Sequence, residues 1–403
     1  MRILFIAPRI PFPPRKGDQL RAFHQLKGLK KLGHDLHLIC YSDEEEVPDE
    51  LNNLCSRIMT VKFKKSAAMM KIAAGMMTNT PVQVSYYESN AFRQAIKEAV
   101  STHSYDVVHT QLVRTYPYFE ELKELPNVLD FVDSISLNLS RRIAFKKSIT
   151  NPLIKHEART IHLMERQAME CFDGSIFISN VDRNYVGDEA QHVATISNGV
   201  DLHYFSYQKK LTEQNNLIFV GNMSYEPNRQ GVKYFIENIY PHIMRKTKDF
   251  TFYVVGRDPT PDLIQLCRDK PNITVTGEVD DIRDYLAKAK LFICPLKTGA
   301  GVQNKVLEAM SAGIPVLTTS IVNDPIGAVE SESVVVRNQD QEFADAAVDL
   351  LSDQNKLEDL RQSARSFVEE NYEWDRLNQK LEQFYRETMY KRNNVFGKES
   401  IHC

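Results

Sequence analysis

Short runs of β-branched and aliphatic residues alternate along the chain with amphipathic stretches of helical length. In the first half, the apolar runs predict strands at residues 2–7, 35–41, 57–63, 106–110, 127–131 and 174–178. The stretches between them predict helices at residues 19–32, 91–103 and 152–171. Strand, crossover helix and strand in this order are typical of a parallel sheet that is covered by helices on both faces.

The same pattern starts again in the second half. Its apolar runs predict strands at residues 217–220, 251–255, 273–276, 291–294, 315–318 and 333–336. The helices predicted between them cover residues 228–244, 261–270, 282–289, 305–312 and 341–352. The pattern therefore predicts an α/β protein with two doubly wound domains, at residues 1–200 and 201–371, facing a cleft where ligands bind at the carboxyl ends of the strands. Residues 372–403 form a polar helix and tail that we expect to pack towards the first domain.

Composition agrees with a soluble globular protein of this size. The chain has 403 residues, of which 42% are hydrophobic and 26% charged, so two cores are expected rather than one. The net charge of −3 argues against a nucleic-acid partner. No apolar run is long enough to span a membrane, and the first is interpreted as a buried strand rather than a signal peptide. We therefore expect a cytoplasmic protein.

Residues 291–316 contain the most informative local pattern. A buried strand leads into a turn with Gly299 and Gly301, and a helix begins near Asn304. Glycines allow close approach of a ligand, and a helix N-terminus offers N–H donors that suit a diphosphate. Lys305 opposes the helix dipole at this end, which favours a role in binding phosphate, and Glu308 lies one turn further on. The competing interpretation is a tight turn followed by a surface Lys–Glu pair.

Residues 304–316, NKVLEAMSAGIPV, resemble the signature of glycosyltransferase family 4, whose members are retaining enzymes of GT-B architecture with two Rossmann-like domains. Further segments resemble the family's glycine loop, interdomain motif, first donor-domain strand and base-flanking segment, at residues 11–21, 196–205, 219–228 and 276–283. The nearest subgroup comprises the sugar transferases of bacterial exopolysaccharide loci, of the PEP-CTERM type. The resemblance implies transfer of a hexose from a UDP- or GDP-sugar to a lipid-linked or polysaccharide acceptor.

The resemblance also implies roles for individual residues. Glu308 would hold the ribose, Gly277 would lie near the base, and Gly17 would approach the donor from the first domain. The diphosphate and the donor sugar would be held by the backbone of five consecutive residues, namely Ala300, Gly301, Val302, Gln303 and Asn304.

The sequence departs from the family pattern in three ways. The first of two usual glutamates falls on Ala300, and Gln111 stands where relatives have an acceptor-side histidine. The basic pair that usually follows the first donor-domain strand is replaced by Asn222 and Glu226. Asn222 remains a donor-binding candidate, and the missing charge would come from Lys305, Arg229 or Lys233.

Departure of the nucleotide diphosphate is the difficult step of such a reaction, because negative charge develops on it. No D-x-D-like motif occupies the expected place, so we expect no metal or other cofactor, with Lys305 and helix-terminal N–H groups stabilising the charge. His109 and Asp133 are candidates near the acceptor, although each is also explained as a buried polar residue at a strand end. Two alternatives are a GT-B sugar-nucleotide epimerase and a non-catalytic binding protein.

Two windows without acidic residues, 51–87 and 134–156, lie in the first half of the chain. The first window interleaves lysines with Phe63, Met69, Met70, Ile72, Met76 and Met77. This composition suggests contact with an anionic membrane, which would place the protein at the inner face of the plasma membrane. The competing interpretation is a methionine-lined acceptor groove.

Overall fold

The computed structural model describes residues 1–43, 46–145, 148–187, 192–299 and 301–399. The chain divides into two compact units, one formed by residues 1–198 with 374–403 and the other by residues 199–373. These divisions lie two residues away from the expected boundaries at 200 and 371. The C-terminal segment, which the sequence sets apart as a third region, is part of the first unit.

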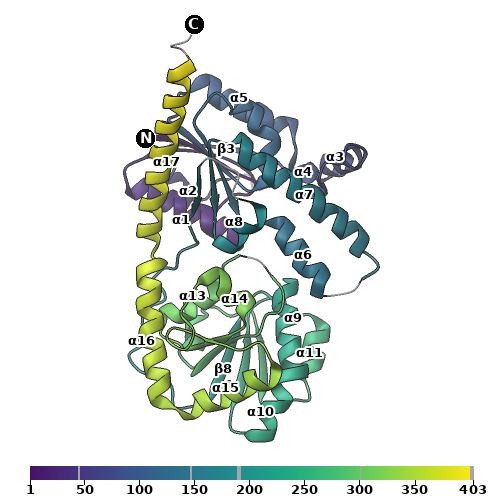
Figure 1. Ribbon diagram of the computed structural model, residues 1–403, viewed down its shortest axis with the longest axis vertical. Helices are drawn as coiled ribbons and strands as arrows, with labels where there is room; N and C mark the ends of the chain where they lie inside the picture. Colours follow the sequence, from purple (N-terminus) through teal and green to yellow (C-terminus); the bar gives the residue numbers. More distant parts are fainter. Residues whose placement is uncertain (44–45, 146–147, 188–191, 300, 400–403) are drawn as a thin grey trace. The chain divides into compact units, whose positions relative to one another are not determined.

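Within the described part of the first unit, seven parallel strands form one sheet in the order β3-β2-β1-β4-β5-β6-β7. Their bounds are β1 Arg2–Ala7, β2 Asp35–Tyr41, β3 Arg57–Val61, β4 Val107–Gln111, β5 Asn127–Val132, β6 Gly174–Phe177 and β7 Val193–Thr195. The helices of this unit are α1 Gly17–Lys31, α2 Asp49–Asn52, α3 Lys65–Met77, α4 Val82–Tyr87, α5 Asn90–Thr102, α6 Ile135–Phe145, α7 Asn151–Cys171, α8 Asn180–Val186 and α17 Trp374–Glu399, with the 3-10 helix η1 at Val113–Glu121 (Figure 1).

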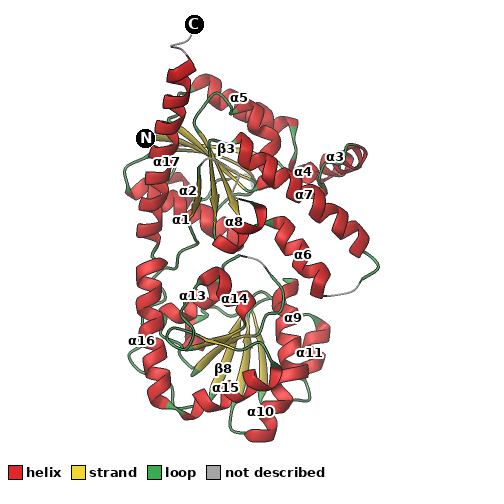
Figure 2. Ribbon diagram, viewed as in Figure 1, coloured by secondary structure: helices red, strands yellow, loops and turns green. Residues whose placement is uncertain are grey.

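The first sheet is covered on both faces because successive side chains of a strand point to opposite sides. Ile3 and Phe5 of β1 pack on one face with apolar side chains from α1 and α17. Leu4 and Ile6 pack on the other face with Phe92 and other side chains of α5. Figure 2 shows the yellow strands lying between red helices in this unit. The near-continuous apolar sequence of β1 is therefore explained by burial on both sides.

Helix α17 is fixed to the first unit by buried apolar and polar contacts. Trp374, Leu377, Leu381 and Phe384 belong to the same core cluster as β1 and α1. The hydroxyl of Tyr385 lies 2.7 Å from Nδ1 of His109 on β4. The prediction that the C-terminal helix returns to the first domain is thus confirmed.

The second unit contains, in its described residues, six parallel strands in the order β10-β9-β8-β11-β12-β13. Their bounds are β8 Asn216–Val220, β9 Thr251–Val255, β10 Ile273–Gly277, β11 Leu291–Cys294, β12 Val316–Thr318 and β13 Val335–Val336. The helices are α9 Glu226–Tyr234, η2 Phe235–Ile239, α10 Tyr240–Lys246, α11 Pro261–Cys267, α12 Arg283–Leu286, α13 Asn304–Ser311, α14 Ser320–Ile326, α15 Asp340–Ser352 and α16 Gln354–Asn371. The predicted class, α/β with two doubly wound Rossmann-like domains, is confirmed.

One helix of the second unit differs from its prediction in an instructive way. The sequence predicts a single helix over residues 228–244, whereas the structure has α9, a π-helical turn η2, and α10 in succession. Pro241 lies at the start of α10 and lacks an N–H, so a regular α-helical ladder cannot pass through it. The wider π turn directly before this proline accommodates the lost hydrogen bond.

Candidate functional site

The order of strands in the second sheet defines where a ligand is expected. From β8, the chain builds outward through β9 and β10, and it then returns to place β11, β12 and β13 on the other side. Neighbouring strands β8 and β11 therefore form the topological switch point, at whose carboxyl end open α/β sheets bind ligands. The loop that follows β8 and the glycine turn that follows β11 both begin at this point.

The turn after β11 brings the start of helix α13 to this edge of the sheet. Gly299 and Gly301 have φ angles of 124° and 67°, which side chains rarely adopt, and this explains the two glycines. Helix α13 then begins at Asn304, with Gln303 in extended conformation before it. The N-terminus of such a helix directs its first N–H groups outward, as a diphosphate requires. Ala300, which the sequence also assigns to the donor, lies outside the described residues.

Lys305 lies in the first turn of α13 and links the two loops of the switch point. Its amine donates a hydrogen bond to Oδ1 of Asn228 on α9 and lies 4.8 Å from the centre of the Phe219 ring. The side chain is half-buried. Burial lowers the pKa of Lys305 from its ordinary value, and the nearby carboxyl of Glu308 opposes this change. The lysine therefore holds a charge in a place where burial disfavours it.

Glu308 is half-buried one turn further along α13. Burial raises the pKa of Glu308 to about 7, and Lys305 opposes the shift. Among the described residues, no side chain or backbone group forms a hydrogen bond or an ion pair with the carboxyl group of Glu308. The interpretation of Lys305 and Glu308 as a surface ion pair is therefore wrong, because Lys305 bonds to Asn228 instead. A poorly solvated carboxylate without a partner is suited to accept hydrogen bonds from ligand hydroxyls.

The loop after β8 is held in place by two asparagines. The backbone oxygen of Asn222 accepts a hydrogen bond of 2.9 Å from Nδ2 of Asn228, and its Oδ1 accepts one of 2.8 Å from the N–H of Ser224. Asn222, Asn228 and Lys305 thus form a chain of contacts from one loop to the other. Asn228 was not among the predicted site residues, since nothing in its local sequence shows that it bonds to Lys305.

The two other basic candidates on α9 lie in different surroundings. Arg229 follows Asn228 directly and is half-buried. Lys233 forms an ion pair with Asp262 of α11. Because that carboxylate already balances its charge, Lys233 is less suited than Lys305 to replace the missing basic pair.

Glycines close the carboxyl ends of β8, β9 and β10. Gly256 follows β9 with a φ of 138°, and a Cβ atom there would lie 2.0 Å from the backbone oxygen of Gly221. Its N–H donates a 3.1 Å hydrogen bond to the carbonyl of Gly277, which ends β10. Gly277 thus lies at the expected edge of the sheet, but on the outermost strand, two strands from β8.

In the first unit, Gly17 and Asp133 lie at the carboxyl edge of the sheet. Gly17 is the first residue of α1, and a Cβ atom there would meet nothing within 4 Å. Asp133 directly follows β5 at a shift in strand register, after Val132 with the unusual φ of 64°. Burial and the neighbouring Asp182 raise the pKa of Asp133 to about 6, while Arg114 opposes the shift. Strained backbone beside a perturbed carboxyl group is a common feature of functional sites.

His109 occupies a different environment from the one that its catalytic assignment requires. Its side chain is fully buried, stacked on Phe5 at 4.2 Å and hydrogen-bonded to Tyr385 of α17. Burial lowers the pKa of His109 to about 4, although Asp130 opposes the shift. A group that touches a substrate must reach the surface of a site, so this burial counts against a catalytic role. The alternative interpretation of His109, a buried polar residue at a strand end, fits better. Its hydrogen-bond partner is the side chain of Tyr385 and not the backbone.

In the described part of the chain, no group of three or more His, Cys, Asp or Glu side chains is arranged to hold a metal ion. None of the described helices is both long and apolar enough to cross a membrane. The expectation that the reaction needs no metal stays a prediction.

Comparison with known proteins agrees with the position of this site. Residues 214–353 match the family described as glycosyl transferases group 1. The matched residues lie within the second unit and include Asn222, Lys305 and Glu308. The narrower assignment to family 4 and to the exopolysaccharide-locus subgroup stays a prediction.

Two curated proteins show further similarity. The chain is 22% identical over 389 residues to an uncharacterized 44.6 kDa protein in the cps region of Klebsiella pneumoniae, covering 92% of this chain and 96% of that protein. It is 29% identical over 161 residues to the GDP-mannose-dependent alpha-(1-6)-phosphatidylinositol monomannoside mannosyltransferase of Mycobacterium tuberculosis, covering 36% of this chain and 42% of that enzyme.

Solved structures show the same fold at low sequence identity. The sucrose-phosphate synthase of Thermosynechococcus elongatus has a TM-score of 0.75 and 16% identity, covering 97% of this chain and 100% of that one. The Anabaena protein Alr3699/HepE in complex with UDP-glucose has a TM-score of 0.63 and 14% identity, also covering 97% and 100%. These similarities establish the fold as that of GT-B glycosyltransferases.

Proposed function

We propose that the protein is a retaining glycosyltransferase that moves a hexose from a UDP- or GDP-sugar to a lipid-linked or polysaccharide acceptor in bacterial cell-surface or exopolysaccharide synthesis. The observation that carries this proposal is the arrangement at the switch point of the second sheet. There, one short helix carries the half-buried Lys305 in its N-terminal turn, and Glu308, whose carboxyl group has no hydrogen-bond partner among the described residues. The group 1 family match and the relative from a cps region support the class of reaction and its setting.

In the proposed reaction, the bond between the anomeric carbon and the diphosphate oxygen breaks, and a bond to the acceptor's hydroxyl oxygen forms. The proton of that hydroxyl passes to the departing diphosphate. Lys305 and the first N–H groups of α13 stabilise the negative charge that develops on the leaving group. Glu308 positions the nucleotide by accepting hydrogen bonds from its ribose. We assign no nucleophile, and the chain's own donors take the place of a metal ion.

Thermal stabilisation by nucleotide-sugars tests the donor site directly. We expect one class among UDP-, GDP- and ADP-sugars to raise the melting temperature, with the effect lost in Lys305→Ala and Glu308→Ala. Lys288→Ala is the matched control, since this exposed lysine precedes β11 and therefore lies at the opposite edge of the sheet. If no nucleotide-sugar stabilises the wild type, or if the control loses as much as the site variants, the donor-site proposal is refuted.

Product analysis separates transfer from the alternatives. A transferase releases the nucleoside diphosphate only as the sugar appears on an acceptor or on water, with the anomeric configuration retained in the glycoside. A sugar-nucleotide epimerase would change the sugar without releasing the nucleotide. A binding protein without catalytic activity would be stabilised by the donor and leave it intact.

We further propose that the first domain rests on an anionic membrane at the inner face of the plasma membrane. Met69 and Met70 of α3 are 61% and 70% exposed, and Ile149 before α7 is 95% exposed. Helix α4 packs against α3. It is also joined to α7, because the N–H groups of Val82 and Gln83 donate hydrogen bonds to the carboxylate of Glu157. Exposed apolar side chains in two windows that lack acidic residues are typical of a membrane-facing surface. Lys146, Lys147 and the side chains of Met76 and Met77 lie outside what the structure describes.

Sedimentation with vesicles tests this surface. We expect binding to rise with the fraction of anionic lipid, to fall with salt, and to weaken in Met69→Ser and Ile149→Ser. Leu163→Ser on the middle of α7 is the control, because its side chain is also exposed but lies outside both windows. Binding that ignores anionic lipid would contradict the proposal.

A further inference from the structure

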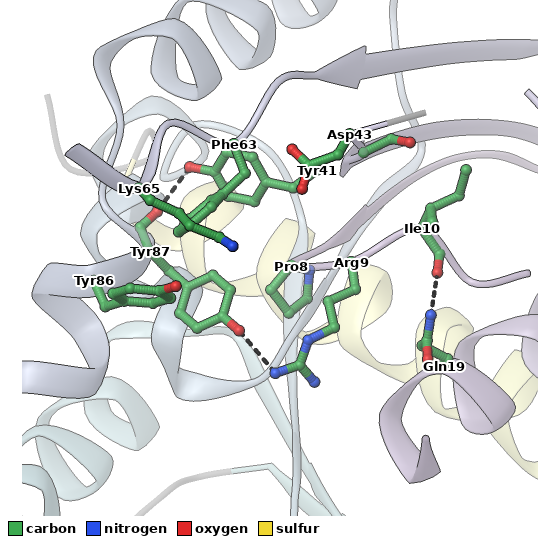
Figure 3. Close-up of a pocket in the computed structure, with 11 residues that line it drawn as sticks. Pro8, Arg9, Ile10, Gln19, Tyr41, Asp43, Phe63, Lys65, Tyr86 and Tyr87 are labelled. Atoms are coloured by element: carbon green, nitrogen blue, oxygen red, sulfur yellow. Dashed lines mark hydrogen bonds between the residues drawn. The ribbon is translucent and has the colours of Figure 1, made fainter. Parts of the chain in front are cut away.

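A pocket of about 360 Å³ lies in the first domain, next to the carboxyl ends of β1, β2 and β3. Its walls are formed by the last residue of β2 and by residues that follow the three strands, together with the end of α4 and one residue each of α1 and α3 (Figure 3). Its volume lies within the range of small-molecule sites. Because β1 lies at the switch point of the first sheet, beside β4, the pocket occupies the edge where α/β sheets bind ligands.

One wall of the pocket is aromatic. The ring of Phe63 packs edge-on against Tyr41 at 5.3 Å and lies 5.0 Å from Tyr86, which in turn packs edge-on against Tyr87 at 5.2 Å. The hydroxyl of Tyr41 donates a hydrogen bond to the backbone oxygen of Tyr87, so the rings are fixed relative to one another. A rigid aromatic wall offers an apolar surface on which the C–H face of a sugar ring can pack.

Other residues that line the pocket are polar, and Arg9 is already held in place. Arg9 forms an ion pair of 2.5 Å with Asp18 and donates a 2.7 Å hydrogen bond to the hydroxyl of Tyr87. Asp18 therefore offsets the charge of Arg9. Asp43, which is exposed at the rim, supplies a carboxylate that can accept hydrogen bonds from hydroxyl groups. Donors and an acceptor beside aromatic rings are the combination that a sugar requires.

Lys65 adds a positive charge to the lining of the pocket. In Figure 3 its amine points into the pocket, and among the described residues it forms no ion pair. Lys65 is also the first residue of α3, directly after Lys64, and the first turn has no acidic residue. Two cations at the positive end of a helix dipole oppose local stability, which favours a functional explanation. An anionic group beside Lys65 would interact favourably with both the lysine and the helix terminus.

Helix α3 continues from the pocket onto an exposed apolar surface. Met69 lies four residues after Lys65 and so on the same face of the helix, one turn away. Met69 and its neighbour Met70 are mostly exposed. A ligand that reaches out of the pocket past Lys65 thus meets flexible, polarizable apolar side chains, which adapt well to an alkyl chain.

We propose that this pocket is the acceptor site and that it takes a lipid-linked saccharide, an amphiphile whose sugar is joined through phosphate to an apolar chain. The sugar lies in the pocket against Tyr86, the phosphate lies beside Lys65 at the start of α3, and the chain runs over Met69. This inference rests on the proposed glycosyltransferase function and narrows its acceptor to the lipid-linked class.

Two soluble probes test the parts of this site separately in the full-length protein. Farnesyl phosphate carries the phosphate and the chain, and glucose 1-phosphate carries the sugar and the phosphate. By calorimetry we expect each to bind at least about tenfold more tightly than inorganic phosphate, and each to displace the other. Farnesyl phosphate that binds no better than inorganic phosphate, or that does not compete with glucose 1-phosphate, would overturn the proposal.

Three variants assign the contacts. Lys65→Ala should weaken both probes by about tenfold, because it removes the partner of the shared phosphate. Met69→Ser should weaken farnesyl phosphate several-fold and leave glucose 1-phosphate unchanged, and Tyr86→Leu should do the reverse. Lys97→Ala, an exposed lysine on α5, is the control and should change neither. Equal loss of both probes in Met69→Ser and Tyr86→Leu would contradict the assigned arrangement.

Donor binding measured on the same proteins separates this inference from the function on which it rests. Stabilisation by a nucleotide-sugar in all three variants, with no binding of either probe to the wild type, would refute the acceptor site alone. If no nucleotide-sugar raises the melting temperature of the wild type, the glycosyltransferase proposal itself is refuted.

Discussion

Replacing Glu308 by glutamine should make the free protein more stable at high pH while abolishing stabilisation by the donor. Burial raises the pKa of Glu308 from 4.5 to about 7, so the folded protein holds a proton there more tightly than the unfolded chain does. Stability from this group is fully present below pH 4.5 and is lost as the pH rises through about 7. A shift of about 2.5 pKa units corresponds to about 3.4 kcal/mol at most. Because the side chain keeps some contact with water, we expect about half of this value.

The measurement is the melting temperature of the second domain between pH 5 and pH 8.5. For a domain of this size, about 1.7 kcal/mol corresponds to a shift of roughly 3–7 °C. Glu308→Gln should melt higher than the wild type by this amount at pH 8 and equally at pH 5, because glutamine does not ionise. The control is Glu332→Gln, an exposed glutamate of the same domain, which should follow the wild type. A wild type and a Glu308→Gln variant with parallel pH profiles would refute the reasoning.

Three further predictions concern the contacts that hold each domain together, each measured by urea unfolding. Gly256→Ala should destabilise the second domain by about 2–4 kcal/mol, because the new Cβ atom would collide with the backbone oxygen of Gly221. Gly327 also has a positive φ, but a Cβ atom there would meet open space, so Gly327→Ala should lower the free energy of unfolding clearly less. Tyr385→Phe should cost about 1–3 kcal/mol by leaving Nδ1 of the buried His109 without a partner, whereas Tyr390→Phe, 71% exposed on the same helix, should change stability by less than about 0.5 kcal/mol. Arg21→Met should cost about 3–5 kcal/mol because it removes the ion-pair partner of the buried Asp130 carboxylate. Adding Asp130→Asn to this variant should restore part of the lost stability. If the losses of the two single variants simply add in the double variant, the coupling is contradicted.

The fold could be predicted from the sequence because both sheets are parallel. Strands that are buried on both faces, such as β1 and β11, are nearly continuous apolar runs, and their predicted bounds match the structure to the residue. Elements without such a signal were missed. β7, Val193–Thr195, is short and only half-buried, and the 3-10 helix η1 contains Pro117.

The candidate site divides in the same way between local and distant contacts. The glycine turn and the start of α13 lie within a few residues of each other, so the sequence alone placed Gly301, Asn304, Lys305 and Glu308 on one turn and helix. Asn228 bonds to Lys305 from 77 residues away, and no local pattern announces that contact.

The candidates His109 and Lys305 lie in different environments although their local sequence settings are alike. His109 and Lys305 are both polar residues close to the carboxyl end of a buried strand, and local sequence cannot distinguish a side chain that faces a ligand from one that faces the core. The difference is made by α17, which brings Tyr385 to His109 across 276 residues and closes that side of the first sheet. Lys305 also has a distant partner, Asn228, but its side chain stays half-buried, and the carboxyl group of Glu308 has no hydrogen-bond or ion-pair partner among the described residues. Near a strand end, therefore, packing by distant parts of the chain decides whether a polar residue is enclosed in the core or remains available to a substrate.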